Sequence, residues 1–188
     1  MNLQRDKSGQ ALLEFAFVLP MLCIFLLGVV DYGRAIYQSE VITNLAGEGS
    51  SVASRSNSGN LVVNLQDAAN VVMADADLDM KTYGCAIVTS VTTGSKAGTY
   101  SITGQEQPNA PTCTISVGSR IGCGPQSGSC NGSATVPPGV GSALSAEPAG
   151  STVYVTEVFY KFSYATPIGG FLGGTGALPA NLYAVAYY

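Results

Sequence analysis

Residues 11–30 read ALLEFAFVLPMLCIFLLGVV, and this stretch decides the fold. Its twenty residues include one charged side chain, that of Glu14. As a helix the stretch would be about 30 Å long, which matches the thickness of a hydrocarbon core. Arg5 and Lys7 precede it, an arrangement that favours a cytoplasmic N-terminus and an exported remainder. The sequence therefore predicts a single membrane-spanning helix over residues 11–30.

The residues after this stretch argue against a cleaved signal peptide. Such peptides end in a cleavage site of small residues directly after the apolar run. Here residues 31–34 read DYGR, which puts an aromatic ring and two charges where small residues are needed. We therefore expect the helix to stay attached to the chain and to anchor its exported part.

The composition excludes several classes of function. The 188 residues carry a net charge of −4 and include no His, and only 11% of them are charged. A nucleic-acid binder needs a clustered cationic face, which eight scattered Lys and Arg residues do not form. Without His the chain lacks the commonest general base and the commonest zinc ligand. We therefore predict no catalytic residues, no cofactor, no metal site and no nucleic-acid partner, and we expect that the protein is not an enzyme.

Two short motifs suggest ligand binding and fail on their spacing. Residues 75–79 read DADLD, but a calcium loop of the EF-hand type needs Gly at its sixth position and Glu at its twelfth. Those positions hold Met80 and Ala86, so a solvated helix end is the better interpretation. Residues 168–176 are rich in Gly but lack the Gly-Lys-Ser/Thr ending of a phosphate-binding loop, and we expect a loop there.

An amphipathic pattern extends the helix beyond the membrane. Apolar and small residues recur at three- and four-residue steps, which is the spacing of one helix face. They are Ile42, Leu45, Ala46, Gly49, Val52 and Ala53. The pattern fades in the polar residues 54–59, so the sequence predicts one long helix over residues 10–55, roughly 65 Å in length.

Residues 56–188 have the pattern of a small exported domain. A second helix is predicted over residues 64–77, with Asn64 as its N-cap. Its apolar face holds Leu65, Ala68, Ala69, Val72 and Ala76. Alternating Val, Thr and aromatic residues predict strands, at residues 86–93, 99–103, 112–117, 151–165 and 182–188, and residues 118–150 form a Gly/Ser/Pro-rich loop. The predicted fold class is α+β, with an antiparallel sheet that covers the long helix.

Four of the five cysteines lie in this domain: Cys85, Cys113, Cys123 and Cys130. An even number of cysteines in an exported, loop-rich domain indicates two disulfides, and three connectivities stay open. The alternative is a metal site with four thiolate ligands. The absence of a C-x-x-C spacing and the oxidising compartment favour the disulfides. Cys23, in the membrane helix, is interpreted as a small apolar residue.

The carboxylate of Glu14 needs an explanation, because it lies inside the apolar run. A charged side chain costs up to about 3 kcal/mol at the centre of a bilayer and less near its edge. One interpretation is a residue of the first helical turn, close to the headgroups and favoured by the helix dipole. The other is a functional carboxylate, and the residues before it favour that interpretation.

Residues 7–15 read KSGQALLEF, in which a short basic leader ends in Gly9 and Glu14 follows as the fifth residue after it. This resembles the cleavage site of type IV prepilins. The longer stretch 8–55 resembles the TadE-like proteins, minor pilins of the tight adherence (Flp) pilus system. The features that match are the Glu-Phe pair, the Leu-Pro in mid-helix, the Gly-x-x-Asp-Tyr-Gly-Arg exit and the following Thr-Asn-x-Ala.

The resemblance implies a pilin-like fold and a route from membrane to filament. Prepilin peptidase would cut after the leader, residues 1–9, and Gln10 would become the first residue. The helix would leave the lipid of the bacterial inner membrane and pack against other pilin subunits with the help of the inner-membrane assembly machinery. The resulting cell-surface pilus would serve adhesion and surface colonisation.

Three residues of the apolar run would take part in assembly according to this resemblance: Glu14, Phe15 and Pro20. A buried Glu14 needs a partner, most simply the new amine of Gln10 on a neighbouring subunit. An N-terminal Gln can cyclise, which would remove that amine. Pro20 removes one backbone hydrogen bond and permits a kink. The alternative function is a permanently anchored exported binding domain that does not polymerise.

Overall fold

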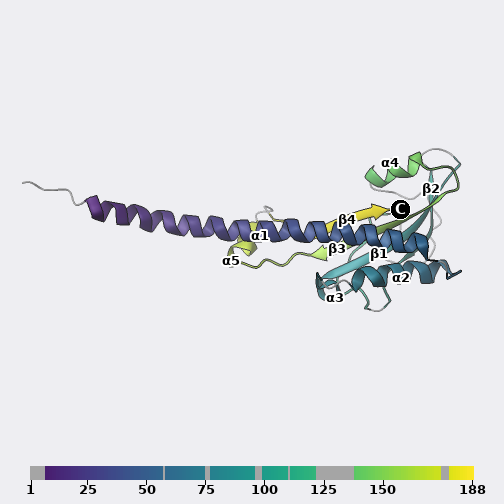
Figure 1. The fold of residues 1–188 in the computed structure, drawn as a ribbon, viewed down its shortest axis with the longest axis horizontal. Helices are drawn as coiled ribbons and strands as arrows, with labels where there is room; N and C mark the ends of the chain where they lie inside the picture. The colour runs from purple at the N-terminus through teal and green to yellow at the C-terminus, as the bar shows by residue number, and fades with distance from the viewer. Residues whose placement is uncertain are drawn as a thin grey trace, which may run out of the picture. The chain divides into compact units, whose positions relative to one another are not determined.

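The computed structural model describes residues 7–56, 58–74, 77–95, 99–109, 111–121, 138–174 and 178–188. Figure 1 shows its helices and strands. In chain order they are α1 (Lys7–Arg55), α2 (Leu61–Met73), α3 (Met80–Tyr83), β1 (Gly84–Thr93), β2 (Tyr100–Glu106), α4 (Pro138–Ala146), β3 (Thr152–Lys161), α5 (Pro167–Gly174) and β4 (Asn181–Tyr187). The fold class is α+β, as the sequence predicts.

The chain divides into two compact units. The first consists of Met1–Tyr37 and Ser163–Ala180, and the second of Gln38–Phe162 and Asn181–Tyr188. The first unit therefore contains the N-terminal part of α1 and the whole of α5. The second contains the C-terminal part of α1, the sheet and the other helices.

The second unit is built on a four-stranded antiparallel sheet with the strand order β2-β1-β3-β4. Cys85 pairs with Phe159 in the centre, and Glu157 pairs with Val185 at the β4 side. The register between β1 and β2 shifts between Ser90 and Val91. The first two predicted strands are confirmed, and they pair with each other, with β2 extending to Glu106.

One face of the sheet is covered by α1 and α2. A Cβ atom added to Gly49 of α1 would lie 2.7 Å from Cγ2 of Val72 in α2 and 2.8 Å from Cγ2 of Thr156 in β3. A Cβ atom on Gly104 of β2 would lie 3.0 Å from Cδ1 of Leu65 in α2. The two glycines therefore let the helices approach the sheet closely. The predicted stripe of α1 is buried here, with Ile42, Ala46 and Ala53 fully so.

The opposite face of the sheet is covered by α4 and by the extended residues 111–121. Successive residues of a strand point to opposite faces, so Val155 lies on the face away from Thr156. Val155 packs in one apolar cluster with Val140 and Leu144 of α4. Figure 1 shows α2 and α4 on opposite sides of the strands. A second cluster joins Cys85, Ile87 and Phe159 to residues 113–117.

Four details of the predicted secondary structure are wrong. The N-cap of α2 is Asn60, whose side chain accepts a hydrogen bond from Val62 N–H, and Asn64 is instead a buried residue inside the helix. Residues 112–117 form no strand; their alternate side chains pack onto the sheet face. The Gly-rich stretches that were expected to be loops contain α4 and α5, each beginning at a Pro, a residue pre-organised for the first helical position. Strand β3 ends at Lys161 and does not reach residue 165.

Substitution of Gly49 tests this packing. Gly49→Ala is expected to lower the free energy of unfolding by about 1–3 kcal/mol, because the new methyl group overlaps Val72 and Thr156. The control is Gly47→Ala, since no described atom lies within 4 Å of a Cβ at that position. There the better helix propensity of Ala should add up to about 1 kcal/mol. Denaturation of both variants in detergent, followed by circular dichroism, measures the difference, and equal effects would contradict the close contact.

Candidate functional site

The apolar run, residues 11–30, is exposed along almost its entire length. All its large apolar side chains are exposed, from 37% for Leu27 to 76% for Met21. Figure 1 shows this part of α1 as the N-terminal stretch of the helix. Within the described residues, α1 is the one helix that is long and apolar enough to cross a membrane. A helix that is apolar on all sides needs lipid or other helices around it.

The predicted cleavage position lies in the first turns of this helix. Helix α1 begins at Lys7, so Gly9 and Gln10 are both helical. The first four N–H groups of a helix have no partner within it, and unwinding these residues therefore breaks few hydrogen bonds. A Cβ on Gly9 would meet no described atom within 4 Å, so the fold itself does not require Gly at this position.

The carboxylate of Glu14 lies one turn further along the helix. Its Oε1 accepts a hydrogen bond of 3.2 Å from Nε2 of Gln10, and both side chains are exposed. Phe15, the next residue, is 62% exposed. The structure therefore brings Gln10 and Glu14 together within one chain.

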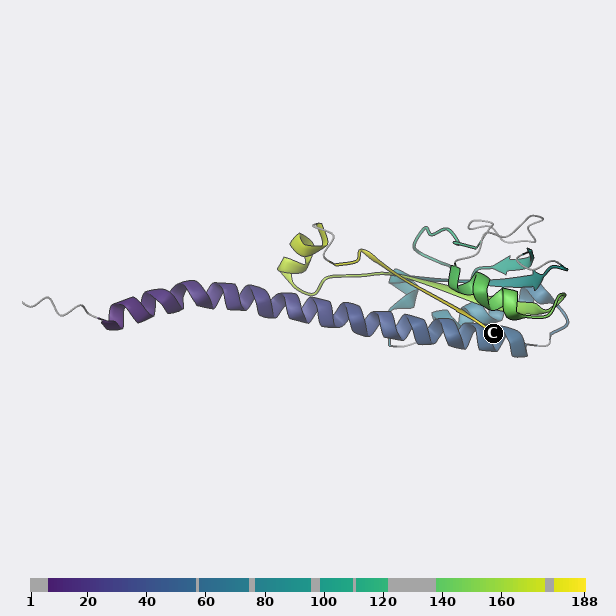
Figure 2. The same ribbon diagram turned by 90° about the horizontal axis from the view of Figure 1, so that it is seen from above.

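Pro20 lies inside α1 and does not end it. Since Pro has no N–H, the carbonyl four residues earlier loses its helical donor. Figure 2 shows the N-terminal part of α1 as a curved helix, and missing backbone bonds of this kind are a usual cause of such curvature.

The buried carboxylate of Asp31 lies directly after the apolar run. Its Oδ1 accepts hydrogen bonds from the backbone N–H groups of Ala165, at 2.8 Å, and Thr166, at 3.3 Å. Its Oδ2 accepts a hydrogen bond from the Thr166 hydroxyl. Asp31 has no exposed surface. It therefore fixes Ala165 and Thr166 to α1 where the apolar run ends. These two residues belong to residues 163–180, here called the connecting segment.

A second buried carboxylate, that of Glu157 in β3, was missed in the sequence. It accepts hydrogen bonds from the Ser119 hydroxyl, from Arg120 N–H at 2.8 Å and from the Tyr183 hydroxyl at 2.9 Å. The guanidinium of Arg120 stacks 3.9 Å above the ring of Tyr183. The signal was present in the strand, because Glu157 alternates with Val155 and Phe159 on an otherwise apolar face.

The polar contacts continue across the sheet from Glu157. Nε2 of Gln105 donates to Oγ1 of Thr89 at 2.9 Å and to Oγ of Ser119 at 3.0 Å. Together Thr89, Gln105, Ser119, Glu157 and Tyr183 form a polar seam, to which every strand contributes one residue. The seam holds residues 119–121 onto the sheet.

The polar seam and the rest of the described chain lack the groups that hold a metal ion. No cluster of three or more His, Cys, Asp or Glu side chains occurs among the described residues. The seam contains one carboxylate, that of Glu157, and both of its oxygens already accept hydrogen bonds from the protein. Its chemistry is therefore that of a structural hydrogen-bond network.

The cysteines fall into two groups. Cys85 and Cys113 form a disulfide, and Cys23 is a free, exposed cysteine in the apolar run. Cys123 and Cys130 lie outside the described residues. Of the three connectivities open in the sequence, only one contains the Cys85–Cys113 bond, and that one pairs Cys123 with Cys130.

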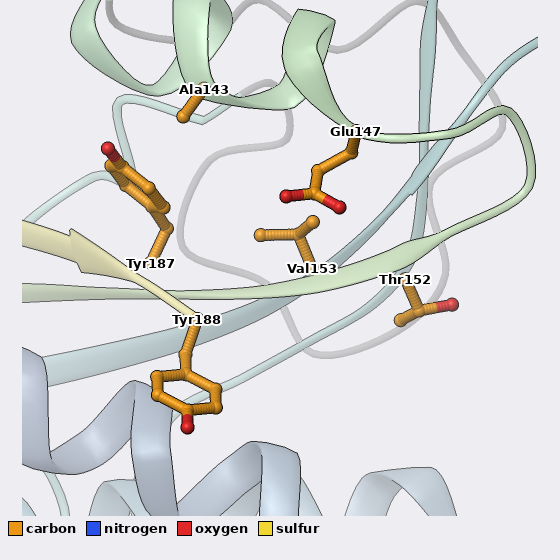
Figure 3. A pocket seen from close by; sticks show the side chains of 6 residues that line it. All are labelled: Ala143, Glu147, Thr152, Val153, Tyr187 and Tyr188. Atoms are coloured by element: carbon orange, nitrogen blue, oxygen red, sulfur yellow. The ribbon is translucent and has the colours of Figure 1, made fainter.

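A shallow cavity of about 290 Å³ lies beside the end of β4. Figure 3 shows Glu147 and Val153 between the side chains of Tyr187 and Thr152, with Ala143 and Tyr188 completing the lining. Glu147 is the one charged residue in this lining. A single exposed carboxylate without a partner nucleophile or cation assigns no chemistry to this cavity.

The comparisons with known proteins concern α1. The TadE-like protein family matches residues 9–51, a stretch that begins at Gly9 and lies wholly within α1. This confirms the resemblance seen in the sequence for that region. No curated protein and no solved structure matches the chain.

The pH dependence of stability tests the environment of Glu157. Burial raises the pKa of its carboxyl above the ordinary value, although hydrogen bonds from Ser119, Arg120 and Tyr183 act in the opposite direction. A raised pKa in the folded state means that the stabilising contribution is complete at low pH and is lost as the pH rises. Glu157→Gln cannot ionise and should flatten this loss in denaturation curves measured from pH 4 to pH 8.

The matched control is Glu147→Gln, which removes an exposed carboxylate from the same unit. It should leave the pH profile of the original chain unchanged. If Glu157→Gln and the original chain lose stability in parallel with rising pH, folding does not raise the pKa of the Glu157 carboxyl.

Peptide mapping tests the disulfide pattern. Trypsin cuts after Lys81, Lys96, Arg120 and Lys161, which separates Cys85 from Cys113 and leaves Cys123 and Cys130 in one peptide. Under non-reducing conditions we expect peptides 82–96 and 97–120 to be joined, and peptide 121–161 to be closed internally. A link between peptide 121–161 and either of the others would contradict this pattern.

Proposed function

We propose that this protein is a pilin-like structural subunit of a tight adherence pilus. It is inserted into the inner membrane through the apolar run, with its N-terminus in the cytoplasm and residues 56–188 exported. Prepilin peptidase removes residues 1–9, and the helix then packs with other pilin subunits through the assembly machinery. The filament serves adhesion and surface colonisation, and the role of this subunit is structural and not enzymatic.

The single observation that carries the proposal is the exposed apolar run, within the region that the TadE-like family matches. Full burial of one large apolar side chain contributes about 1.5–3 kcal/mol. A run with exposed Phe17, Met21 and Phe25 therefore cannot remain in water. A bilayer surrounds it before assembly, and the apolar helices of other pilin subunits surround it in a filament.

In the proposed assembly Glu14 sets the axial position of each helix relative to its neighbours. Near the headgroups its carboxylate is solvated, but inside a filament it would be buried and would need a donor. The bond from Gln10 uses one of its two oxygens, Oε1. Removal of the leader keeps Gln10 and adds an amine at the same residue. The amine of a neighbouring subunit can then approach the carboxylate, and a pair of this kind favours one axial position over others.

Gly9 distinguishes the proposal from the alternative, a permanently anchored exported domain. An anchored domain has no use for a cleavable leader, and the fold places no demand on Gly at this position because a Cβ there meets no described atom. A dependence on Gly9 would therefore come from the peptidase.

Gly9→Val tests this point. We expect full-length Gly9→Val protein to accumulate in the membrane with residues 1–9 attached, and filaments containing it to be lost. The original chain should be found in sheared filaments with Gln10, free or cyclised, as its first residue. Mass spectrometry of the N-terminal peptide from filaments and membranes measures both.

The matched control is Gly33→Ala, a substitution in the same helix at another site where a Cβ meets no described atom. This variant should be processed and assembled normally. If the original chain keeps its leader and stays in the membrane, the protein is an anchored exported domain and the pilin proposal is wrong.

A further inference from the structure

We propose that the connecting segment, Ser163–Ala180, is a second membrane contact. Helix α5 would lie in the headgroup and upper acyl region of the leaflet in which the apolar run of α1 ends. The inference rests on the proposed function, because it requires α1 to be in a bilayer. The partner is therefore a lipid surface, and the contact exists before the subunit enters a filament.

The position of α5 along α1 is fixed by hydrogen bonds. Asp31 directly follows Val30, the last residue of the apolar run, and its carboxylate binds Ala165 and Thr166. Gly169, in the first turn of α5, lies so close to Asp31 that a Cβ could not be accommodated. Figures 1 and 2 both show α5 beside α1. The beginning of α5 is therefore level with the end of the apolar run.

The residues of α5 suit this depth. The helix reads PIGGFLGG and contains no polar side chain, and no residue from Phe162 to Tyr188 is charged. Residues 121–146 are also uncharged, but they are rich in Ser and contain no adjacent pair of large apolar residues like Phe171 and Leu172. Leu27, one turn before Asp31, is the least exposed large side chain of the apolar run, at 37%.

The backbone at the entry to α5 needs little water. The N–H groups of Ala165 and Thr166 are bonded to Asp31, and the N–H of Gly169 is bonded to Oγ1 of Thr166 at 3.2 Å. Pro167, the first residue of α5, has no N–H. Unsatisfied backbone donors are what keeps irregular segments out of lipid. These bonds therefore remove most of that penalty.

The two faces of α5 are distinguished by its glycines. Gly169 and Gly173 both lie against Tyr164, and neither leaves room for a Cβ. By the 3.6-residue repeat, position 171 falls on the opposite face of the helix. That position holds Phe171, the largest residue of α5. In the proposed contact this face, opposite the two glycines, meets the lipid.

The strength of such a contact depends on the tether. Three apolar residues contribute a few kcal/mol at most when they are partly buried, which is too little to hold a free peptide on a membrane. Asp31 holds α5 next to a helix that is already inserted, so the second contact is intramolecular and has a high effective concentration. The contact therefore orients the exported part and does not itself anchor the protein.

The chain contains no Trp, so a single introduced Trp reports its own surroundings. The test uses the full chain in phosphatidylethanolamine/phosphatidylglycerol vesicles that contain lipids labelled with a nitroxide quencher at a shallow or a deep acyl position. Phe171→Trp reports on α5. Phe25→Trp reports on the apolar run, and Tyr188→Trp, at a 67% exposed residue, reports on a site expected in water.

We expect Phe171→Trp to show blue-shifted emission and stronger quenching by the shallow label than by the deep one, which corresponds to a depth of about 5–10 Å below the surface. Phe25→Trp should be quenched by the deep label, and Tyr188→Trp by neither. Adding Asp31→Ala to Phe171→Trp should reduce the quenching of the introduced indole because the tether is lost. Leu172→Trp provides a second reporter if Phe171→Trp disturbs the segment.

The outcomes separate the inference from the function on which it rests. Water-like emission from both Phe171→Trp and Leu172→Trp, together with a quenched Phe25→Trp, overturns the lipid contact and leaves the membrane insertion of α1 intact. An unquenched Phe25→Trp overturns membrane insertion itself. Blue-shifted emission of Phe171→Trp that neither label quenches, and that disappears on dilution of the protein in lipid, would assign α5 to a contact with a second copy and would likewise overturn the proposal.

Discussion

The backbone hydrogen bonds of α1 hold Lys7–Arg55 as one helix, and its surface changes in character at Asp31. Before Asp31 the helix is apolar on all sides and exposed. After it, the buried residues follow a four- and three-residue spacing through Ala35, Gln38 and Ile42. One helix thus presents two kinds of surface in succession, apolar on all sides before Asp31 and buried along one side after it.

Two buried carboxylates, those of Asp31 and Glu157, each hold an irregular segment in place through hydrogen bonds. The connecting segment and residues 111–121 are rich in Gly, Ser and Thr, so apolar packing alone orders them poorly. Asp31 collects donors from the first of these segments and Glu157 from the second. Asp31 accepts from two backbone N–H groups and Glu157 from one, and each also accepts from a side-chain hydroxyl of the segment that it binds. A chain with few charges therefore uses two of them to order its irregular parts.

The sequence predicted the elements that follow from local periodicity. The long helix and its buried stripe follow from apolar residues that recur every three or four positions, and the strands of the sheet from residues that alternate every second position. Residues 112–117 show where this fails: alternate side chains do point inward, as in a strand, but the segment lies across the face of the sheet and not at its edge. Alternation reports one buried side and does not report backbone pairing.

The parts that were missed depend on residues far apart in the chain. Asp31 was recognised only as the end of the apolar run, because its partner Ala165 is 134 positions away. Helices α4 and α5 contain helix-breaking glycines, and in α4 the packing of Val140 and Leu144 overrides that local preference. Glu157 could have been found, since a carboxylate on an apolar face of a strand needs donors from elsewhere.

The unequal burial of the two bonded cysteines determines which sulfur of their disulfide can be attacked in the folded chain. Cys85 has no exposed surface, whereas Cys113 is only half buried. An attacking thiolate therefore reaches the sulfur of Cys113 and not that of Cys85, and Cys85 is the thiol that leaves. Once closed, the bond offers a reductant only the Cys113 side. The second unit thus holds a cross-link that exchanges slowly with thiols in solution.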